Sequence, residues 1–372
     1  MTNQIPQTST PAVETNLREI RYQYSHNLVT ILSELGASLF VSTYQAGKLA
    51  VVWVNDSSLN ITFHNFEQAM GVALRRDCIG VGGEDWIYFL KNAPELASQI
   101  EPQNQHDACF LTRGSHFTNN ISVHEIAWGT QELWIVNTLF SCLCTLHNNY
   151  SFVPQWKPPF ISALAAEDRC HLNGLALVNG EPKYVTVLGQ TDTARGWREN
   201  KATGGCVLEV PTGKVIVEGL AMPHSPRFYQ NRLWVLNSGV GELMSLDLIS
   251  GKPETVAILP GYPRGLALIG NLAFVGLSKI RETAVFGSLP ICERFDALKC
   301  GVAIIDIPTG EMLGLLELHS GVDEIFDVQL LPFIRRPAFF GPYARREGIA
   351  PIWLVPTPDN NNSLRQEADP HH

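Results

Sequence analysis

Two histidines of this chain stand at matching positions of two similar segments. The segments VHEIAWGTQELWIVNT (123–138) and PHSPRFYQNRLWVLNS (223–238) align without a gap, so His124 matches His224 at an offset of 224 − 124 = 100. A third histidine, His171, stands just before the apolar segment LNGLAL. Neutral imidazole is a good ligand for Zn, Fe or Mn, and a metal held in this way can polarise a carbonyl or lower the pKa of bound water towards about 7.

Polar neighbours could complete such a site. We predict one divalent ion, Zn, Fe, Mn or Ca, held by His124, His171, Asn173, His224 and Glu125. We also predict that His124 and His224 are catalytic together with Asp327, whose carboxylate could act as a general base if burial raised its pKa. The competing interpretation is that the histidines cap loops or bind strand ends and that the carboxylates are solvated.

Arginines form a second group of candidates. The guanidinium group is planar and can bind a carboxylate or a phosphate through two hydrogen bonds. The loop TDTARGWRENKATGG (191–205) is longer than a tight hairpin, and loops of this length are often functional. We predict that an anionic or sugar-like substrate is bound by Arg227, Arg264, Arg195, Arg198 and an exposed Trp197. The alternative is a solvated loop whose tryptophan is anchored by packing.

The histidine segments belong to a larger repeat. HLNGLALVNGEPKYVTVL (171–188), YPRGLALIGNLAFVGLS (262–278) and AMGVALRRDCIGVGG (69–83) each contain an apolar strand, a polar turn and a second β-rich strand. The successive strand starts are separated by 54, 48, 52, 39 and 63 residues. Repeated β-meanders of about 40 to 50 residues are typical of propeller blades. We therefore predict an all-β, six-bladed β-propeller with a central tunnel.

The innermost strand of every blade lines the tunnel, so equivalent residues of different blades should converge. One set of equivalent positions is Met70, His124, Leu172, His224, Pro263 and Phe326, and the set that follows it is Gly71, Glu125, Asn173, Ser225, Arg264 and Asp327. Because side chains alternate along a strand, a slip of one residue would exchange the inward set, and both sets remain candidates. Large second-strand side chains, including Trp134 and Trp234, should fill the space between sheets.

Both ends of the chain should close the ring. The N-terminal copy, ASLFVSTYQAGKLAVVWV (37–54), lacks an innermost strand, and EIFDVQLLP (324–332) can supply it, which removes an open sheet edge. Seven blades result instead if IAPIWLVP (349–356) completes its own blade and LVTILSEL (28–35) starts the first.

Three segments stand apart from the repeats. Residues 1–18 and 357–372 are polar and without periodicity, so we predict disordered ends around a single domain, 19–356. The segment KIRETAVFGSLPICERFDALKC (279–300) interrupts the meander and could fold as a short helix over one face.

Two family resemblances follow from these motifs. HLNGLALVNGEPKYVTVL and PHSPRFYQNRLWVLNSGVGELMSLDLISGK resemble the gluconolactonase, senescence-marker-protein and strictosidine-synthase group of six-bladed propellers. With LGASLFVSTYQAGKL and GQTDTARGWRENKATGG, nearly the whole chain is similar to a bacterial family of conserved hypothetical propeller proteins. The first resemblance implies a divalent cation at one tunnel mouth, with Asn173 as one ligand. His224 or Ser225 occupies the place of that group's Asp, which puts lactone hydrolysis in doubt.

Composition narrows the classes of function. A formal charge of −9 provides no field for a nucleic-acid backbone, and no run approaches the ~18 apolar residues of a membrane span. The start of the chain lacks the regions of a secretory signal, and eight cysteines, with Cys142 and Cys144 expected as free buried thiols, fit the reducing cytosol. We predict a cytoplasmic protein. No GxGxxG, Walker or GxSxG motif is present, so no nucleotide cofactor is expected.

Two classes of function remain open. The first is a small-molecule site at one tunnel mouth, as in a metal-assisted hydrolase or lyase acting on an anionic or sugar-like substrate. The second is a non-catalytic propeller that binds a protein partner or a carbohydrate on a loop face. The sequence alone does not decide whether the chain is an enzyme.

Overall fold

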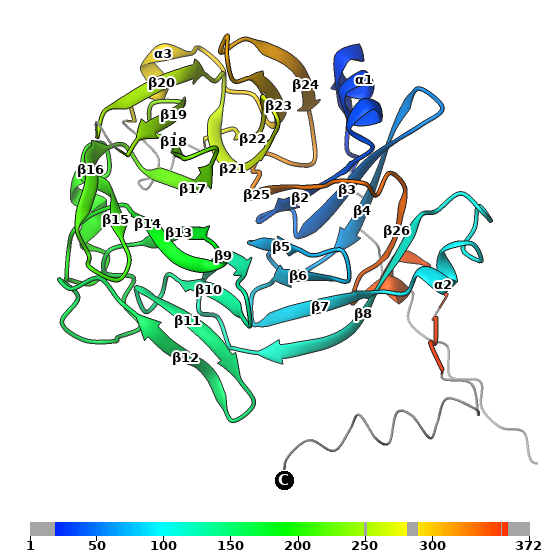
Figure 1. The fold of residues 1–372 in the computed structure, drawn as a ribbon, viewed down its shortest axis with the longest axis horizontal. Helices are drawn as coiled ribbons and strands as arrows, with labels where there is room; N and C mark the ends of the chain where they lie inside the picture. The colour runs from blue at the N-terminus through cyan, green and yellow to red at the C-terminus, as the bar shows by residue number, and fades with distance from the viewer. Residues whose placement is uncertain (1–18, 249–250, 281–288, 351, 356–372) are drawn as a thin grey trace, which may run out of the picture.

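Six sheets stand around a common axis and form the predicted six-bladed propeller (Figure 1). The computed structural model describes residues 19–248, 251–280, 289–350 and 352–355. The ends predicted to be disordered, 1–18 and 357–372, lie outside the described residues.

Each sheet begins near the axis with its innermost strand and continues outward. The first sheet contains β25 (Asp327–Leu331), β2 (Ser38–Thr43), β3 (Lys48–Asn55) and β4 (Ser58–Asn65), and the second contains β5 (Val72–Leu74), β6 (Cys78–Gly82), β7 (Trp86–Asn92), β8 (Ala108–Phe117) and β26 (Pro337–Phe340). The third contains β9 (Val123–Trp128), β10 (Leu133–Asn137), β11 (Cys142–His147) and β12 (Tyr150–Trp156), and the fourth contains β13 (Leu172–Val178), β14 (Glu181–Val187), β15 (Gly205–Glu209) and β16 (Val215–Leu220). The fifth contains β17 (Pro223–Tyr229), β18 (Arg232–Asn237), β19 (Glu242–Asp247) and β20 (Pro253–Ile258), and the sixth contains β21 (Tyr262–Ile269), β22 (Leu272–Ser278), β23 (Gly301–Asp306), β24 (Met312–Leu318) and β1 (Tyr22–Tyr24).

The ring closes as predicted, because a strand from the C-terminal part of the chain pairs with a strand from the N-terminal part. β25 pairs antiparallel with β2, in a register that joins Asp327 to Ser42 and Leu331 to Ser38. Two further strands were not predicted, because β1 extends the outer edge of the sixth sheet and β26 runs parallel to β8 on the second. Three sheets are therefore completed by strands that are distant in sequence.

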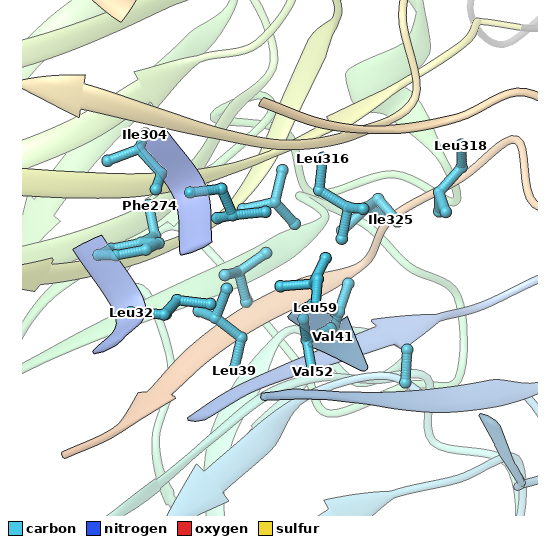
Figure 2. Packing of buried hydrophobic residues seen from close by; sticks show 14 of the residues in the cluster. Leu32, Leu39, Val41, Val52, Leu59, Phe274, Ile304, Leu316, Leu318 and Ile325 are labelled. Carbon is cyan, nitrogen blue, oxygen red and sulfur yellow. The ribbon is translucent and has the colours of Figure 1, made fainter. Parts of the chain in front are cut away.

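The segment 28–35 is helical, and the seven-bladed alternative is therefore wrong. α1 (His26–Leu35) ends at Gly36, whose φ of 57° is the left-handed conformation common after a helix end. Its buried side chains include Leu28 and Leu32, which belong to the cluster between the sixth and first sheets. Figure 2 shows Leu32 in this seam. The described residues of 349–356 form no strand.

Side chains of the middle strands fill the seams between neighbouring sheets. Between the sixth and first sheets, Phe274 and Ile304 belong to one buried cluster with Leu39 and Val52 (Figure 2). Trp234 of β18 is only 2% exposed, as predicted for a second strand. Truncation of such a residue typically costs about 3 to 5 kcal/mol, so these positions serve packing.

Short helical segments lie in the connections between strands. The predicted helix within 279–300 is present as α3 (Ile291–Arg294), although 281–288 lie outside the described residues. Ile291 is buried in one cluster with Trp197, Met222 and Tyr262. The remaining helical segments are α2 (Pro94–Ala97) and the 3-10 turns Gly196–Asn200 and Ala344–Glu347. Across the described ranges, every helix is too short or too polar to cross a membrane.

Candidate functional site

Three inner strands begin shortly after a residue with the same left-handed backbone conformation. Gln68, Ser122 and Met222 have φ values of 50°, 54° and 49°, and each stands two residues before a side chain that lines the tunnel mouth. Those side chains are Met70, His124 and His224. The left-handed region costs a non-glycine residue about 1–2 kcal/mol, and such residues cluster at functional sites. The duplicated histidine therefore belongs to a repeated strand entrance.

A cavity of about 230 Å³ lies at this end of the tunnel and is called the histidine cavity below. Its lining includes His124, His171 and His224, which come from the third, fourth and fifth sheets or their entrances. The rings of His124 and His171 meet edge to face, with centroids 4.7 Å apart. The ring of His124 also lies 5.2 Å from that of Phe326.

His124 and His224 are held in one tautomer by equivalent contacts. Nδ1 of His124 lies 3.2 Å from the carbonyl oxygen of Ser122, and Nδ1 of His224 lies 2.9 Å from that of Met222. A carbonyl oxygen only accepts, so Nδ1 carries the hydrogen and Nε2 keeps its lone pair. Burial, reinforced by neighbouring His171 and Arg264, lowers the pKa of both histidines well below the usual range. Both rings are therefore neutral at pH 7.

His171 has a charged partner instead of a carbonyl. Its Nδ1 lies 2.9 and 3.0 Å from the two carboxylate oxygens of Asp168. Trp197 donates its indole N–H to the same carboxylate over 3.0 Å. Contrary to the prediction, Trp197 is buried, with 2% of its surface exposed, because its ring packs 4.5 Å from that of His171. The loop that carries Trp197 therefore forms part of the cavity wall.

Arg264 brings a buried cation to the cavity wall beside Phe326. Its guanidinium carbon lies 3.5 Å from the ring centroid of Phe326, and its Nη1 donates to Glu324 over 3.3 Å. Burial lowers the pKa of Arg264 from its usual value, although nearby carboxylates and tyrosines oppose this. The side chain is 8% exposed and lines the cavity.

Two inner strands depart from the first of the two predicted sets of equivalent positions, which otherwise supplies Met70, His124, His224 and Phe326 to the cavity. Leu172 is buried between the third and fourth sheets, whereas His171, with φ of 49°, reaches the cavity. In β21 the pairing shifts between Pro263 and Leu266, around a left-handed Gly265. Such turns place Arg264 rather than Pro263 in the cavity, which strand alternation alone could not predict.

Deeper in the tunnel, three charged side chains form an axial ion network. Arg227 donates from Nη1 to Glu125, and its Nη2 lies 3.7 Å from Oδ1 of Asp327. Glu125 also accepts the backbone N–H of Leu175 over 3.0 Å, and Asp327 accepts that of Val72 over 2.9 Å. Burial, partly offset by Arg227, raises the pKa of Glu125 to about 7 and also raises that of Asp327. The network therefore ties inner strands to their neighbours.

The predicted catalytic and binding residues are only partly brought together. Asp327 lies in the axial ion network, outside the histidine cavity that contains His124 and His224. Arg227 lies in the same network, and Arg195 is exposed outside the cavity lining. The cavity lining does include Arg198, whose guanidinium lies 5.4 Å from the ring centroid of Trp197. The lining thus takes one arginine from the loop and one from an inner strand.

The predicted metal ligands do not converge on one point. Glu125 is engaged by Arg227, while Asn173 accepts from Thr186 over 2.5 Å and donates to the carbonyl of Pro223 over 3.0 Å. In the part of the chain that the structure describes, no three His, Cys, Asp or Glu side chains are placed to hold a metal ion. The residues present therefore do not fit the cation implied by the lactonase-like resemblance, and no chemical step is derived through one.

Sequence reasoning missed several lining residues. Asp168 stands three positions before His171, and this spacing was the available signal for their contact. The other missed residues include Tyr44, Gln68 and Asn120. These three lie in connections between strands, where neither periodicity nor repetition marks the direction of a side chain.

A family model described as "Domain of unknown function (DUF4915)" matches residues 26–340. The chain belongs to this family. The DUF4915 match begins at the first residue of α1 and ends at the last residue of β26, so it contains every strand of the propeller except β1.

Comparisons of this DUF4915 protein with curated proteins and solved structures do not indicate a function. No curated protein matches the sequence. A chain in a crystal structure of a nidogen/laminin complex is similar with 9% identity and a TM-score of 0.48, over 79% of this chain and 98% of that chain. The fold assignment rests on the six sheets described above.

Proposed function

We propose that the histidine cavity binds a small, polyhydroxylated, sugar-like molecule. The observation that carries this proposal is that three imidazole rings engage Nδ1 elsewhere and leave Nε2 for the cavity. Hydroxyl groups can donate hydrogen bonds to these nitrogens. A carboxylate, which only accepts, cannot do so.

The charges around the cavity favour a neutral ligand over an anion. Arg264 is paired with Glu324. Arg198 is the other lining cation, and Asp168 is the other lining carboxylate. His124 and His224 are neutral, and the two arginines and two carboxylates cancel among the described lining residues. An anion would therefore gain little from the overall field.

The walls and the size of the cavity suit a compact molecule. Trp197 and Phe326 supply aromatic surface beside the polar groups, a combination typical of small-molecule sites. At about 30 Å³ for each water molecule, a volume of about 230 Å³ holds roughly eight water-sized groups.

Calorimetry with a panel of neutral monosaccharides and sugar acids tests the proposal. His224→Phe keeps an aromatic ring and removes the Nε2 acceptor, so the best neutral ligand should bind about tenfold more weakly. His26→Gln is the control, since His26 is exposed on α1. Unchanged binding to His224→Phe, or binding restricted to sugar acids, would contradict the proposal.

We also propose that the protein works in a reducing compartment such as the cytoplasm. All eight cysteines are free thiols, and seven of them are buried, including Cys142 and Cys144 of β11. Burial raises the pKa of Cys170 and Cys206 to about 12, which keeps these thiols protonated and inert.

A further inference from the structure

The tunnel end opposite the histidines contains a second space. Two adjoining cavities of about 270 and 250 Å³ share Arg227, Phe228 and Gln329 in their linings. Among the described residues, none lines both this space and the histidine cavity. The axial ion network lies between the two ends, so each end presents its own binding surface.

A ring of apolar side chains surrounds this second space, one from each blade. The ring consists of Leu74, Trp128, Leu177, Phe228, Leu268 and Leu330. All six lie within the last three residues of an inner strand, and all are only partly buried. A ring of partly exposed apolar side chains around a cavity favours a ligand with a hydrocarbon portion.

The axial ion network, of which Glu125 and Arg227 line the space, contains two carboxylates and one arginine. Glu125 and Asp327 are 6% and 4% exposed, and Arg227 is the one cation that the structure places between them. With both carboxylates ionised, the network has one uncompensated negative charge. Buried charge is costly unless it is paired, so a proton on one of the two carboxylates or a bound cation can supply the balance.

Backbone acceptors add to this preference for a cation. The six inner strands are the end strands of their sheets, so one edge of each is unpaired and faces the tunnel. Carbonyl oxygens along these edges can accept from an ammonium group, which has three donors. Arg75 stands near the rim but is held against Trp128, with its Nη2 donating to the carbonyl of Gly129 over 2.6 Å.

We propose that this opposite tunnel end is a second binding site, which takes a small primary alkylammonium ion. The charged group lies against Glu125, where it replaces the balancing proton, and the hydrocarbon stem lies against the apolar ring. No covalent step is involved. The site is independent of the proposed sugar-like ligand.

Calorimetry at about pH 8 with hexylamine, hexanol and hexanoate tests the charge preference. The three probes share one stem and differ in charge, so hexylamine should bind about tenfold more tightly than hexanol, and hexanoate should bind most weakly. Equal affinities, or tighter binding of hexanoate, would overturn the proposal.

Variants locate the site. Glu125→Gln should lower hexylamine affinity to that of hexanol, whereas Glu324→Gln at the histidine cavity should leave it unchanged. Leu177→Lys places a competing cation in the ring and should weaken hexylamine about tenfold, with Leu164→Lys on exposed surface as its control. The variants Leu177→Lys and Leu164→Lys test where hexylamine binds even if Glu125→Gln does not fold. Unchanged hexylamine binding in Leu177→Lys would overturn the proposal.

Discussion

At the scale of single residues, the histidines of one cavity are held by different hydrogen-bond partners. His124 donates to a carbonyl, whereas His171 faces the carboxylate of Asp168. The same carboxylate also accepts the indole N–H of Trp197, so it joins the ring of His171 to the loop that carries Trp197. The three histidines are therefore one structural group with two kinds of hydrogen-bond partner.

Glu125→Gln should change how stability depends on pH. The folded-state pKa of about 7 exceeds the usual 4.5, so in this interval the native state retains a proton that the unfolded chain releases. The stability from this group is present below about pH 4.5 and is lost as pH rises through about 7. Between about pH 5 and 8, the wild type should lose free energy of unfolding relative to Glu125→Gln in urea titrations.

The control for this prediction is Glu132→Gln, because Glu132 is exposed next to β10. Its pH profile should run parallel to that of the wild type. Parallel profiles for Glu125→Gln as well would mean that burial does not hold a proton on Glu125.

At the scale of elements, neighbouring inner strands meet in two alternating ways. Gly71, Gly174 and Gly265 allow close approach to the next inner strand, where an added Cβ would lie within 2.8 Å of its atoms. At the other three interfaces a side chain bridges instead. Those side chains are Glu125, Ser225 and Asp327, each of which accepts a backbone N–H from the next inner strand. The ring therefore alternates between backbone contact and side-chain bridging.

Gly265→Ala should be much more destabilising than Gly270→Ala. Both residues have positive φ, 81° and 55°, which costs an alanine about 1–2 kcal/mol. At Gly265 a Cβ would also lie 2.4 Å from the backbone nitrogen of Val328, whereas nothing lies within 4 Å at Gly270. Overpacking adds about 1–3 kcal/mol at the first position only. Equal losses of unfolding free energy by chemical denaturation would contradict this contact.

At the scale of the whole molecule, the ring depends on a strand supplied late in the chain. β25 is the inner strand of the first sheet and also carries Asp327 of the axial ion network. Without β25, β2 would present an unpaired edge to solvent, and the seam with the sixth sheet would open.

A chain that ends at residue 322 should therefore lose cooperative unfolding and self-associate. Circular dichroism during heating and size-exclusion chromatography measure these two properties. A peptide spanning 319–341, which contains β25 and β26, should restore both when added in trans, and a scrambled peptide should not. A monomeric, cooperatively folding truncated chain would show that closure is not required.

Much of the architecture was predictable because blades repeat and each strand has its own periodicity. The six sheets and the pairing of 324–332 with the first sheet follow from repeated apolar strands and one missing inner strand. The segment 28–35 was ambiguous, since a short apolar run fits a helix or a strand. Packing against the seam between the first and sixth sheets selects the helix.

The sequence by itself predicted an all-β propeller, most of its strands and the segments that carry His124 and His224, and the structure decided between six and seven blades. The tertiary structure alone decided that Trp197 is buried, that Arg264 reaches the histidine cavity and that Asp327 does not. The physical reason is that left-handed residues such as His171 and Gly265 shift the direction of a side chain without changing the apolar pattern. Which groups meet across the tunnel depends on those shifts, and they become visible only when six sheets surround one axis.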